Sequence, residues 1–334
     1  MKTVKVTEPL QVKIEEAELP VRGKGEALLR VKYVGFCGSD VAIYKGTQPF
    51  GSYPRIPGHE FSAEIVDVDE NDKGFRPGMT VTAKPYFNCG KCYSCRNGKT
   101  NCCENNQTMG VQRDGAFAEY CVVPIDKLVD GKGIPANILP LVEPFCIGYH
   151  AIKRADLQKG DKVLIFGAGP IGTFAALAAQ QYGATVLLTD VLESRLTLAK
   201  EMGVDYIVTS DKLQEKLEEL SWKKEVEVCV EAAGMAQTFL SCINEVGFGG
   251  KIVLIGNGKT EVSFNHSVLL QKEVTVFGSR NSIWEFEEAI DMIVAGKLHL
   301  TKIVTHVLPF GEAKKAFDIL ANNDGTASKV LLQL

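Results

Sequence analysis

Four cysteines fall in one polar stretch of the chain. Cys89, Cys92, Cys95 and Cys103 follow the spacing C-x-x-C-x-x-C-x7-C. Four thiolates spaced in this way can surround a tetrahedral zinc ion and leave no coordination position open, which predicts a structural site. Zinc binding would supply the folding energy that this loop, rich in glycine, asparagine and lysine, lacks. Cys102 could take the place of Cys103 as the fourth ligand, but the spacing favours Cys103. The alternative to a zinc site is a set of reduced thiols or a redox switch.

A second set of candidate ligands is dispersed along the chain. Cys37 lies in VGFCGSD, His59 and Glu60 lie in PGHEF, and Glu143 lies in LVEPF. A cysteine, a histidine and carboxylates can form a zinc site that keeps one position open for water or substrate. Zinc in such a site lowers the pKa of a bound alcohol, which can then release hydride to a nicotinamide. The alternative is a buried cysteine and a capped histidine that bind nothing.

A glycine-rich turn lies between an apolar strand and a helix. Gly167, Gly169 and Gly172 form the pattern G-x-G-x-x-G. The first glycine permits a sharp turn, the second lets a pyrophosphate approach the backbone, and the third lets helix and strand pack closely. The next strand ends at Asp190, whose carboxylate can bind a ribose diol and repel a 2′-phosphate, which favours NAD over NADP. The alternative is a glycine turn in a purely structural βαβ unit.

The elements that must position these residues form two regions. Residues 1–85 are rich in strand patterns, and residues 86–110 form the cysteine-rich loop. From about residue 160 the segments KVLIF, TVLLTD, DYIVTS, EVCVEAAG, GKIVLIG and EVTVFGS predict six strands, with helical segments between the first five. This alternation predicts an α/β fold with a doubly wound parallel sheet. Helices are expected over 282–295 and near 313–321, in a tail that folds back onto the N-terminal part.

Composition narrows the class of protein. A chain of 334 residues is expected to hold about two domains. The net charge of −4 without a basic block gives no indication of a nucleic-acid partner. The N-terminus lacks an apolar signal core, and no run reaches the ~20 apolar residues of a membrane span, so we expect a cytoplasmic protein without a membrane partner. The clustering of the 10 cysteines indicates metal binding rather than disulfides.

The sequence resembles the zinc-dependent medium-chain dehydrogenase/reductase family of the alcohol dehydrogenase superfamily. The resemblance is strongest to the sorbitol (polyol) and threonine dehydrogenase branch and covers essentially the whole chain. The matching motifs, in the family order, are CGSD at 37–40, GHE at 58–60, the cysteine lobe at 89–103, EP at 143–144, GAGPIG at 167–172, Asp190 with Arg195, and GSR at 278–280.

The resemblance implies a fold of two domains. A GroES-like, partly open β-barrel catalytic domain would comprise residues 1–145 and 278–334. A Rossmann NAD-binding domain with six parallel strands would comprise residues 146–277. The active site would lie in the cleft between them. The family commonly forms homodimers or homotetramers by pairing edge strands of the dinucleotide domains.

The resemblance also implies roles at the catalytic zinc. Cys37 and His59 would be ligands, and Glu60 would be a ligand or close partner that exchanges with water. Glu143 stands where simple alcohol dehydrogenases have cysteine, and in the polyol branch a glutamate there binds zinc or holds its water.

One departure concerns the proton route. Ser39 matches the hydroxyl that relays the substrate proton in the family. The polyol branch usually continues CGSD-x-H with a histidine that passes protons to solvent, and Ala42 occupies that position here. The relay is therefore expected to end differently, from Ser39 or from the zinc-bound water directly.

The remaining implied roles concern NAD. The glycine turn with Asp190 and Arg195 would hold the phosphates and the adenosine, and Arg280 could reach a substrate hydroxyl or carboxylate. The residues implied to bind the cofactor are Gly167, Gly169, Pro170, Ile171, Gly172, Asp190, Arg195, Ile255, Gly256, Ser279 and Arg280. Outside this set, His150, Trp284 and Phe286 are expected to be packing residues, and the alternative for Trp284 and Phe286 is a place in the lining of the substrate cleft.

The expected function is therefore reversible oxidation of a secondary alcohol to a ketone, with two zinc ions per chain and NAD. The expected substrate is a polyol or a sugar acid. Two alternatives stay open: oxidation of an amino alcohol, as in L-threonine 3-dehydrogenase, and a zinc- and NAD-binding regulatory protein with little turnover. A zinc-free reductase is disfavoured because such proteins lack these ligands.

Overall fold

The computed structural model describes all 334 residues. The chain folds into two compact units. The first unit comprises Met1–Glu143, Phe286–Gly296 and Val304–Leu334, and the second comprises Pro144–Glu285 and Lys297–Ile303. The segment 146–277, predicted to bind a dinucleotide, lies within the second unit. None of the helices has the length and apolar character needed to cross a bilayer.

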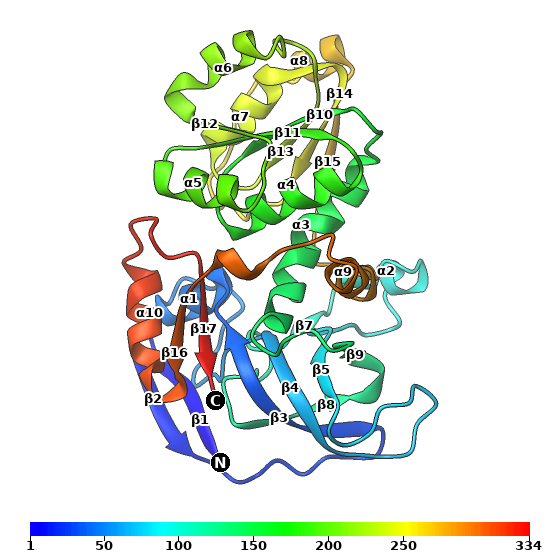
Figure 1. Cartoon of the computed structure of the whole chain (residues 1–334), viewed down its shortest axis with the longest axis vertical. Coiled ribbons are helices and arrows are strands. Elements are labelled where there is room, and N and C mark those ends of the chain that lie inside the picture. Colours follow the sequence, from blue (N-terminus) through cyan, green and yellow to red (C-terminus); the bar gives the residue numbers. More distant parts are fainter. The chain divides into compact units, whose positions relative to one another are not determined.

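The second unit is built on a sheet of six parallel strands (Figure 1). The strands are β10 (Lys162–Phe166), β11 (Thr185–Asp190), β12 (Tyr206–Thr209), β13 (Val226–Glu231), β14 (Val246–Leu254) and β15 (Thr275–Gly278). Their order is β12-β11-β10-β13-β14-β15, which confirms the predicted doubly wound sheet. The direction of winding reverses between β10 and β13, and ligands of such sheets bind beyond the carboxyl ends of the strands at that point.

Helices cover both faces of this sheet, with α4 and α5 on one face and α7 and α8 on the other (Figure 1). Helix α4 packs closely because its buried face includes four alanines between Ala175 and Ala179. Strands buried on both faces are apolar throughout, which explains the continuous apolar runs in the sequence. The helices are α3 (Val142–Ala155), α4 (Pro170–Gln181), α5 (Glu193–Glu201), α6 (Leu213–Glu219), α7 (Ala236–Glu245) and α8 (Ser267–Lys272).

The first unit contains a seven-stranded, mostly antiparallel sheet. Its path is β16-β17-β3-β4-β5-β9, and β8 pairs with β3. The strands are β3 (Glu26–Gly35), β4 (Glu60–Val68), β5 (Thr80–Ala83), β8 (Tyr120–Pro124), β9 (Leu128–Asp130), β16 (Val304–Pro309) and β17 (Lys329–Gln333). The C-terminal strand β17 pairs antiparallel with β3, so the tail folds back onto the N-terminal part as predicted.

Smaller elements surround this sheet. The hairpin of β1 (Lys2–Glu8) and β2 (Gln11–Glu16) and the ribbon of β6 (Tyr86–Phe87) and β7 (Gln107–Thr108) form two further sheets. The helices of the first unit are α1 (Gly38–Tyr44), α2 (Tyr93–Arg96), α9 (Glu285–Val294) and α10 (Ala313–Ala321). An aromatic cluster lies in its core, where the ring of Phe36 is 4.6 Å from that of Phe117 and 4.9 Å from that of Phe317.

One late segment differs from the prediction. Helix α9 begins at Glu285 rather than at residue 282, because the carboxylate of Glu285 accepts hydrogen bonds from the N–H groups of Ile283 and Trp284 and holds them in a turn. Phe286 is fully buried, as expected. Trp284 is 63% exposed, so the prediction that it packs in the core is wrong.

Candidate active site and metal centres

The register between β3 and β4 brings the first three candidate ligands together. Gly35 in β3 pairs with Glu60 in β4, and the chain turns at Cys37 into α1. The ligand atoms of Cys37, His59 and Glu60 all lie within 4.8 Å of one another, and the histidine and glutamate are buried. Cys37, which follows the end of β3, therefore faces His59 and Glu60 at the start of the neighbouring strand β4.

A buried carboxylate ties these segments together. Asp40 is fully buried and accepts hydrogen bonds from the N–H of Cys37 at 2.8 Å and from the N–H of Gly58 at 3.1 Å. Its Oδ1 lies 4.0 Å from Nδ1 of His59. Asp40 thus fixes the backbone on both sides of the cluster and faces the imidazole. The sequence signal for this role is an acidic residue three positions after the cysteine that begins the helix.

The electrostatics of the cluster favour a cation. Burial alone would lower the pKa of His59, but Cys37, Asp40 and Glu143 outweigh it and raise that pKa well above its ordinary value. Three groups that are negative when ionised therefore surround a buried imidazole, so the space between them favours positive charge. A thiolate, an imidazole and a carboxylate are the donors that zinc prefers, and the residues fit a zinc ion.

Glu60 is also paired with a lysine that sequence reasoning missed. The ammonium of Lys329, in β17, donates to both carboxylate oxygens of Glu60, and the distance to Oε2 is 2.6 Å. Burial raises the pKa of Glu60 to about 7, an effect that the charge of Lys329 opposes. The two residues are 269 positions apart, so only a charged residue within an otherwise apolar strand could have indicated the pair.

Glu143 lies beside the cluster and is not a member of the close group. It is buried in the first turn of α3, and its Oε1 accepts a hydrogen bond from the hydroxyl of Tyr86. Its charge contributes to the raised pKa values of His59 and Glu60. The hydroxyl oxygen of Ser39 is buried without a hydrogen-bond partner, as is Nδ1 of His59. A substrate hydroxyl could satisfy the serine.

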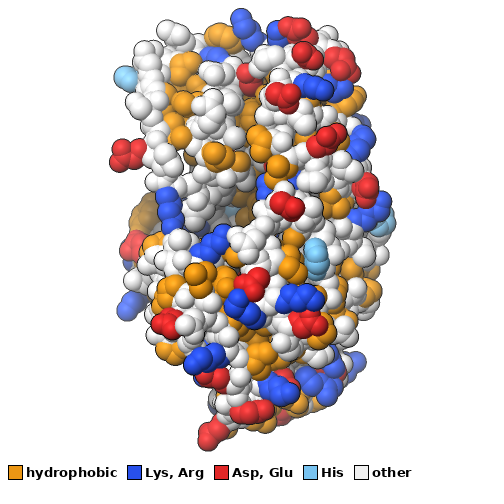
Figure 2. Space-filling view, turned by 90° about the vertical axis from the view of Figure 1, so that its left-hand side faces the viewer, with side chains coloured by type: hydrophobic (Ala, Val, Ile, Leu, Met, Phe, Trp, Pro, Cys, Tyr) orange, Lys and Arg blue, Asp and Glu red, His pale blue; other side chains and the backbone are white.

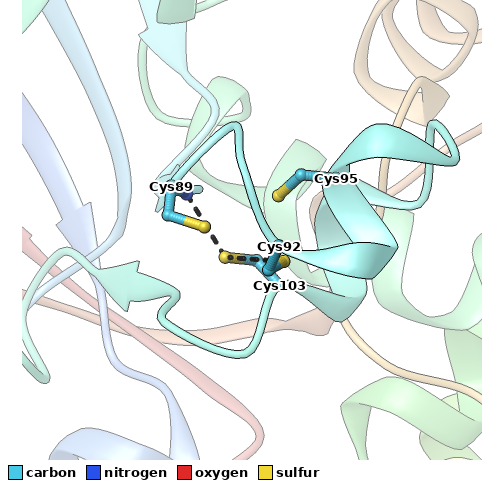
Figure 3. Close-up of side chains that lie close together, drawn as sticks. All are labelled: Cys89, Cys92, Cys95 and Cys103. Carbon is cyan, nitrogen blue, oxygen red and sulfur yellow. Dashed lines mark hydrogen bonds between the residues drawn. The ribbon is translucent and has the colours of Figure 1, made fainter.

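The cysteine-rich loop forms a second candidate metal centre. The sulfur atoms of Cys89, Cys92, Cys95 and Cys103 lie within 4.8 Å of one another. Figure 3 shows the four side chains, which come from the loop around α2, converging on one small volume. The N–H groups of Lys91 and Cys92 lower the pKa of Cys89 to about 6, which favours the thiolate that binds metal. The group includes Cys103 and does not include Cys102.

The glycine turn follows β10 in the second unit. Gly167 has φ +104°, a conformation that glycine adopts without strain. A Cβ on Gly172 would lie 1.8 Å from the carbonyl oxygen of Gly167, whereas a Cβ on Gly169 would meet nothing within 4 Å. Gly172 is therefore required by packing, and Gly169 leaves open space at the start of α4, where helix N–H groups can bind a phosphate.

Asp190 connects this turn with the end of β11. Its Oδ2 accepts a hydrogen bond from the N–H of Ala168 at 2.7 Å, and its Oδ1 accepts one from the N–H of Leu192 at 2.9 Å. Arg195 lies 3.6 Å from Oδ2 of Asp190. The acidic residue is thus fixed beside the glycine turn, with the arginine next to it.

The residues implied to line the nicotinamide end follow β14 and β15. The N–H groups of Ile255 and Gly256 donate to the carbonyl oxygen of Glu231 at 2.9 and 3.0 Å, and the buried hydroxyl of Ser279 has no partner. Arg280 follows Ser279 and is exposed. Glu231, missed from the sequence, accepts hydrogen bonds through its side chain from the N–H of Gly234 and from Thr238, at 2.8 and 2.6 Å. It orders the loop beside these residues.

His150 is a buried helix residue, as predicted, but it is also paired. Its Nδ1 lies 2.8 Å from Oε1 of Glu285, and both side chains are buried. Burial opposes the charged form of Glu285, but the hydrogen bonds from His150 and from the N–H of Ile283 outweigh it and lower the pKa of that carboxyl. The sequence offered no signal for this contact across 135 residues.

Comparisons with known proteins match both halves of the chain. The family model described as the alcohol dehydrogenase GroES-like domain matches residues 23–135, and the model described as zinc-binding dehydrogenase matches residues 170–295. An uncharacterized zinc-type alcohol dehydrogenase-like protein of Haemophilus influenzae is 36% identical and covers 99% of this chain and 98% of its own length. L-Galactonate-5-dehydrogenase of Escherichia coli is 34% identical, with 95% of each chain covered. Sorbitol dehydrogenase of Halalkalibacterium halodurans is 34% identical, with 96% and 94% covered.

Solved structures agree with these relatives. A structure of the rspB protein of Escherichia coli, described as an alcohol dehydrogenase complexed with NADH, has a TM-score of 0.93 and 31% identity, and covers 100% of this chain and 99% of its own. Galactitol-1-phosphate dehydrogenase of Escherichia coli has a TM-score of 0.90 and 29% identity, with 100% of both chains covered. The relatives that match over nearly the full length and the solved structures with the same fold therefore indicate the same family. The chain belongs to the zinc-dependent medium-chain dehydrogenases, oxidoreductases that act on the CH–OH group of alcohols.

Proposed function

We propose that the chain is a zinc-dependent, NAD-linked enzyme that reversibly oxidises a secondary alcohol of a polyol or sugar acid to the ketone. The observation that carries the proposal is the close group of Cys37 with the buried His59 and Glu60, beside which lies the buried carboxylate of Glu143. An open zinc site next to a carboxylate suits a substrate with several hydroxyl groups, because carboxylate oxygens accept hydrogen bonds from them.

The chain's own residues hold and tune the metal. Cys37, His59 and Glu60 would bind the catalytic zinc. Zinc, when bound, acts as a Lewis acid that lowers the pKa of the substrate alcohol. Oδ1 of Asp40 lies 4.0 Å from Nδ1 of His59, so the charge of this carboxylate acts on the imidazole. Lys329 compensates the charge of Glu60.

The proton leaves through Ser39 in this proposal. Its buried hydroxyl is without a protein partner, so it can accept the proton of the substrate hydroxyl while it donates its own to a water molecule, which carries it to solvent. Ala42 cannot continue the relay, since it replaces the histidine usual in the polyol branch.

The hydride goes to NAD in this proposal. The pyrophosphate would lie over Gly169 at the start of α4, where the backbone leaves open space. Asp190 would accept hydrogen bonds from the adenosine ribose and repel a 2′-phosphate, with Arg195 beside it. Ile255, Gly256, Ser279 and Arg280 would lie at the nicotinamide end. The cysteine lobe would hold a second, structural zinc ion.

The substrate class rests on Glu143, on Arg280 and on the relatives. Two relatives, each 34% identical, are named for L-galactonate, a sugar acid, and for sorbitol, a polyol. Arg280 is exposed and could pair with the carboxylate of a sugar acid. An amino alcohol is the nearest alternative, because an Aliivibrio fischeri relative that is also 34% identical is named L-threonine 3-dehydrogenase.

A regulatory protein with little turnover is a second candidate. One specific observation favours it, since a relative that is 32% identical over 99% of this chain is named starvation-sensing protein RspB. Fast alcohol-dependent reduction of NAD would exclude this candidate.

We also propose a homodimer or homotetramer. Strand β15 ends the six-stranded sheet, and Val276 on it is 37% exposed. The outer side of such an edge can pair with the same strand of a second copy.

The experiment that tests the substrate class is reduction of NAD and of NADP by the zinc-loaded chain. The panel contains sorbitol, galactitol, L-galactonate, L-idonate and L-threonine. We expect turnover with a polyol or a sugar acid and with NAD. Turnover on threonine alone would move the substrate to amino alcohols, and equal rates with NADP would contradict the role given to Asp190.

A further inference from the structure

The hydroxyl of Tyr86, in strand β6, donates a hydrogen bond to Oε1 of Glu143. Tyr86 is 9% exposed and Glu143 is 3% exposed, so the hydrogen bond between them is buried. A phenol donates one proton, and a carboxylate offers about four acceptor positions. The bond therefore fixes the carboxylate through Oε1 and leaves Oε2 with capacity to accept another hydrogen bond.

The element that carries Tyr86 is itself held in place. Tyr86 lies in β6, which pairs with β7 through Tyr86 and Thr108, and the N–H of Met109 donates to the carbonyl oxygen of Pro85 at 3.0 Å. Strands β6 and β7 stand at the two ends of the cysteine lobe. The phenol of Tyr86 is therefore carried by a paired strand next to the cysteine-rich loop, and the backbone hydrogen bonds of that strand hold it in position.

The two carboxylates next to Cys37 have different partners. Glu60 is held by the ammonium of Lys329 and is within the close group of candidate ligands. Glu143 is held by a neutral phenol and is outside that group. Glu60 and Glu143 thus differ in the group that holds them. At Glu143 that group is the single hydroxyl of Tyr86.

We propose that Tyr86 is a positioning residue that holds Glu143 out of the metal's ligand set and keeps it as an acceptor for a hydroxyl group of the substrate. The inference rests on the proposed function, since it assigns Glu143 a task in the same site. A Glu143 carboxylate kept free to accept a hydrogen bond makes the site selective for substrates that have a second hydroxyl next to the reacting one. A buried acceptor that is left unpaired by a simple alcohol penalises that substrate.

The first test uses Co²⁺ in place of zinc, because the visible absorption of cobalt reports its ligands. The spectrum of the Cys37→Ser variant is subtracted, which removes the contribution of the cysteine lobe. Glu143→Gln is expected to leave this difference spectrum unchanged, because Glu143 is outside the ligand set. A shift of the bands in Glu143→Gln would show that Glu143 binds the metal and would overturn the proposal.

The second test removes the hydroxyl. In Tyr86→Phe the buried Oε1 loses its donor, so Glu143 is expected to turn toward the metal and shift the cobalt bands. The same substitution in the Glu143→Gln background is expected to cause no shift. An unchanged spectrum in Tyr86→Phe, or an equal shift in both backgrounds, would contradict the role of Tyr86.

A matched control is available in the same unit. Tyr44 is also buried and its hydroxyl donates to a carboxylate, Asp318, at 2.9 Å. Tyr44→Phe is expected to leave the cobalt spectrum and the kinetics unchanged. Tyr86→Phe is expected to lower kcat/KM on the best polyol about 10- to 100-fold, the loss typical of a hydrogen bond to a charged group.

The outcomes separate this proposal from the proposed function. Absence of any Cys37-dependent cobalt band in the unaltered chain would overturn the proposed catalytic metal site, and the positioning role with it. A Cys37-dependent band and turnover that Tyr86→Phe leaves unchanged would overturn the role of Tyr86 alone.

Discussion

At the scale of single residues, the pair of Glu60 and Lys329 decides the charge of the candidate site. Both side chains are buried, and burial raises the pKa of Glu60 to about 7 even with the lysine present. Replacing Lys329 by methionine removes the cation, so Glu60 is expected to take up a proton near neutral pH and to bind metal less tightly. Breaking a buried pair on one side costs about 3–5 kcal/mol.

We therefore expect Lys329→Met to have a lower free energy of unfolding in urea. We also expect it to lose the metal ion that is bound at the site of Cys37, His59 and Glu60. Lys329→Arg, which keeps the charge, is the control and should retain most of both. Unfolding curves and metal content that match the unaltered chain would show that the pair has no such role.

At the scale of elements, the glycine turn offers two substitutions with opposite expectations. Gly172→Ala would place a Cβ 1.8 Å from a backbone oxygen, so the turn between β10 and α4 must deform. Thermal unfolding should show a lower Tm. Gly169→Ala meets nothing within 4 Å in the protein, so Tm should be unchanged.

The same two variants test the dinucleotide site by titration with NADH. Gly169→Ala should weaken binding although it is stable, because its methyl group fills the space assigned to the pyrophosphate. Unaltered NADH affinity in Gly169→Ala would place the cofactor elsewhere.

The pair of His150 and Glu285 makes stability depend on pH. The carboxyl pKa of Glu285 is lowered in the folded state from its ordinary value of 4.5. Such a group stabilises the fold above its unfolded pKa, and the contribution is lost as pH falls through the folded value. Glu285→Gln should thus cost about 1.5–3 kcal/mol at pH 7 and progressively less below about pH 4.5.

Urea unfolding from pH 7 to pH 3 measures this difference. Glu287→Gln is a suitable control, since the side chain of Glu287 is 51% exposed and its ion pair with Lys84 lies at the surface. A difference between the Glu285 variant and the unaltered chain that stays constant down to pH 3 would contradict the assignment.

At the scale of the whole molecule, the prediction concerns assembly. The two edge strands of the six-stranded sheet, β15 and β12, carry Val276 and Tyr206, and each side chain is 37% exposed. A lysine on an edge discourages pairing with a second copy. Val276→Lys should therefore reduce the oligomer to smaller species in sedimentation, whereas Tyr206→Lys should not. An unchanged oligomer in Val276→Lys would exclude β15 as the interface.

The surface that is visible in Figure 2 has no large patch of a single charge that would attract an oppositely charged macromolecule. Acidic and basic side chains alternate across that face, and the net charge of the chain is −4. Electrostatic steering of a large polyanion needs a continuous basic surface. A small substrate remains the proposed partner.

The parts that sequence could predict are those set by local pattern. The strands around Val163 and the glycine turn at 167–172 depend on residues close in the chain, and the parallel sheet followed from alternating strands and helices. Lys329 and Tyr86 could not be predicted, because their partners lie 269 and 57 residues away and are chosen by the fold. The start of α9 was misplaced because Glu285 holds the preceding turn.

The most direct measurement is the rate of NADH formation by the zinc-loaded chain and by its Cys37→Ser variant, on the same polyol and sugar-acid panel. The account predicts turnover on at least one member and loss of about a thousandfold or more in the variant, as expected when the Lewis acid is lost. Metal at the cysteine lobe should be retained in both proteins. Turnover that survives in Cys37→Ser would contradict the assignment of the catalytic zinc, and its absence in both proteins would favour the regulatory alternative.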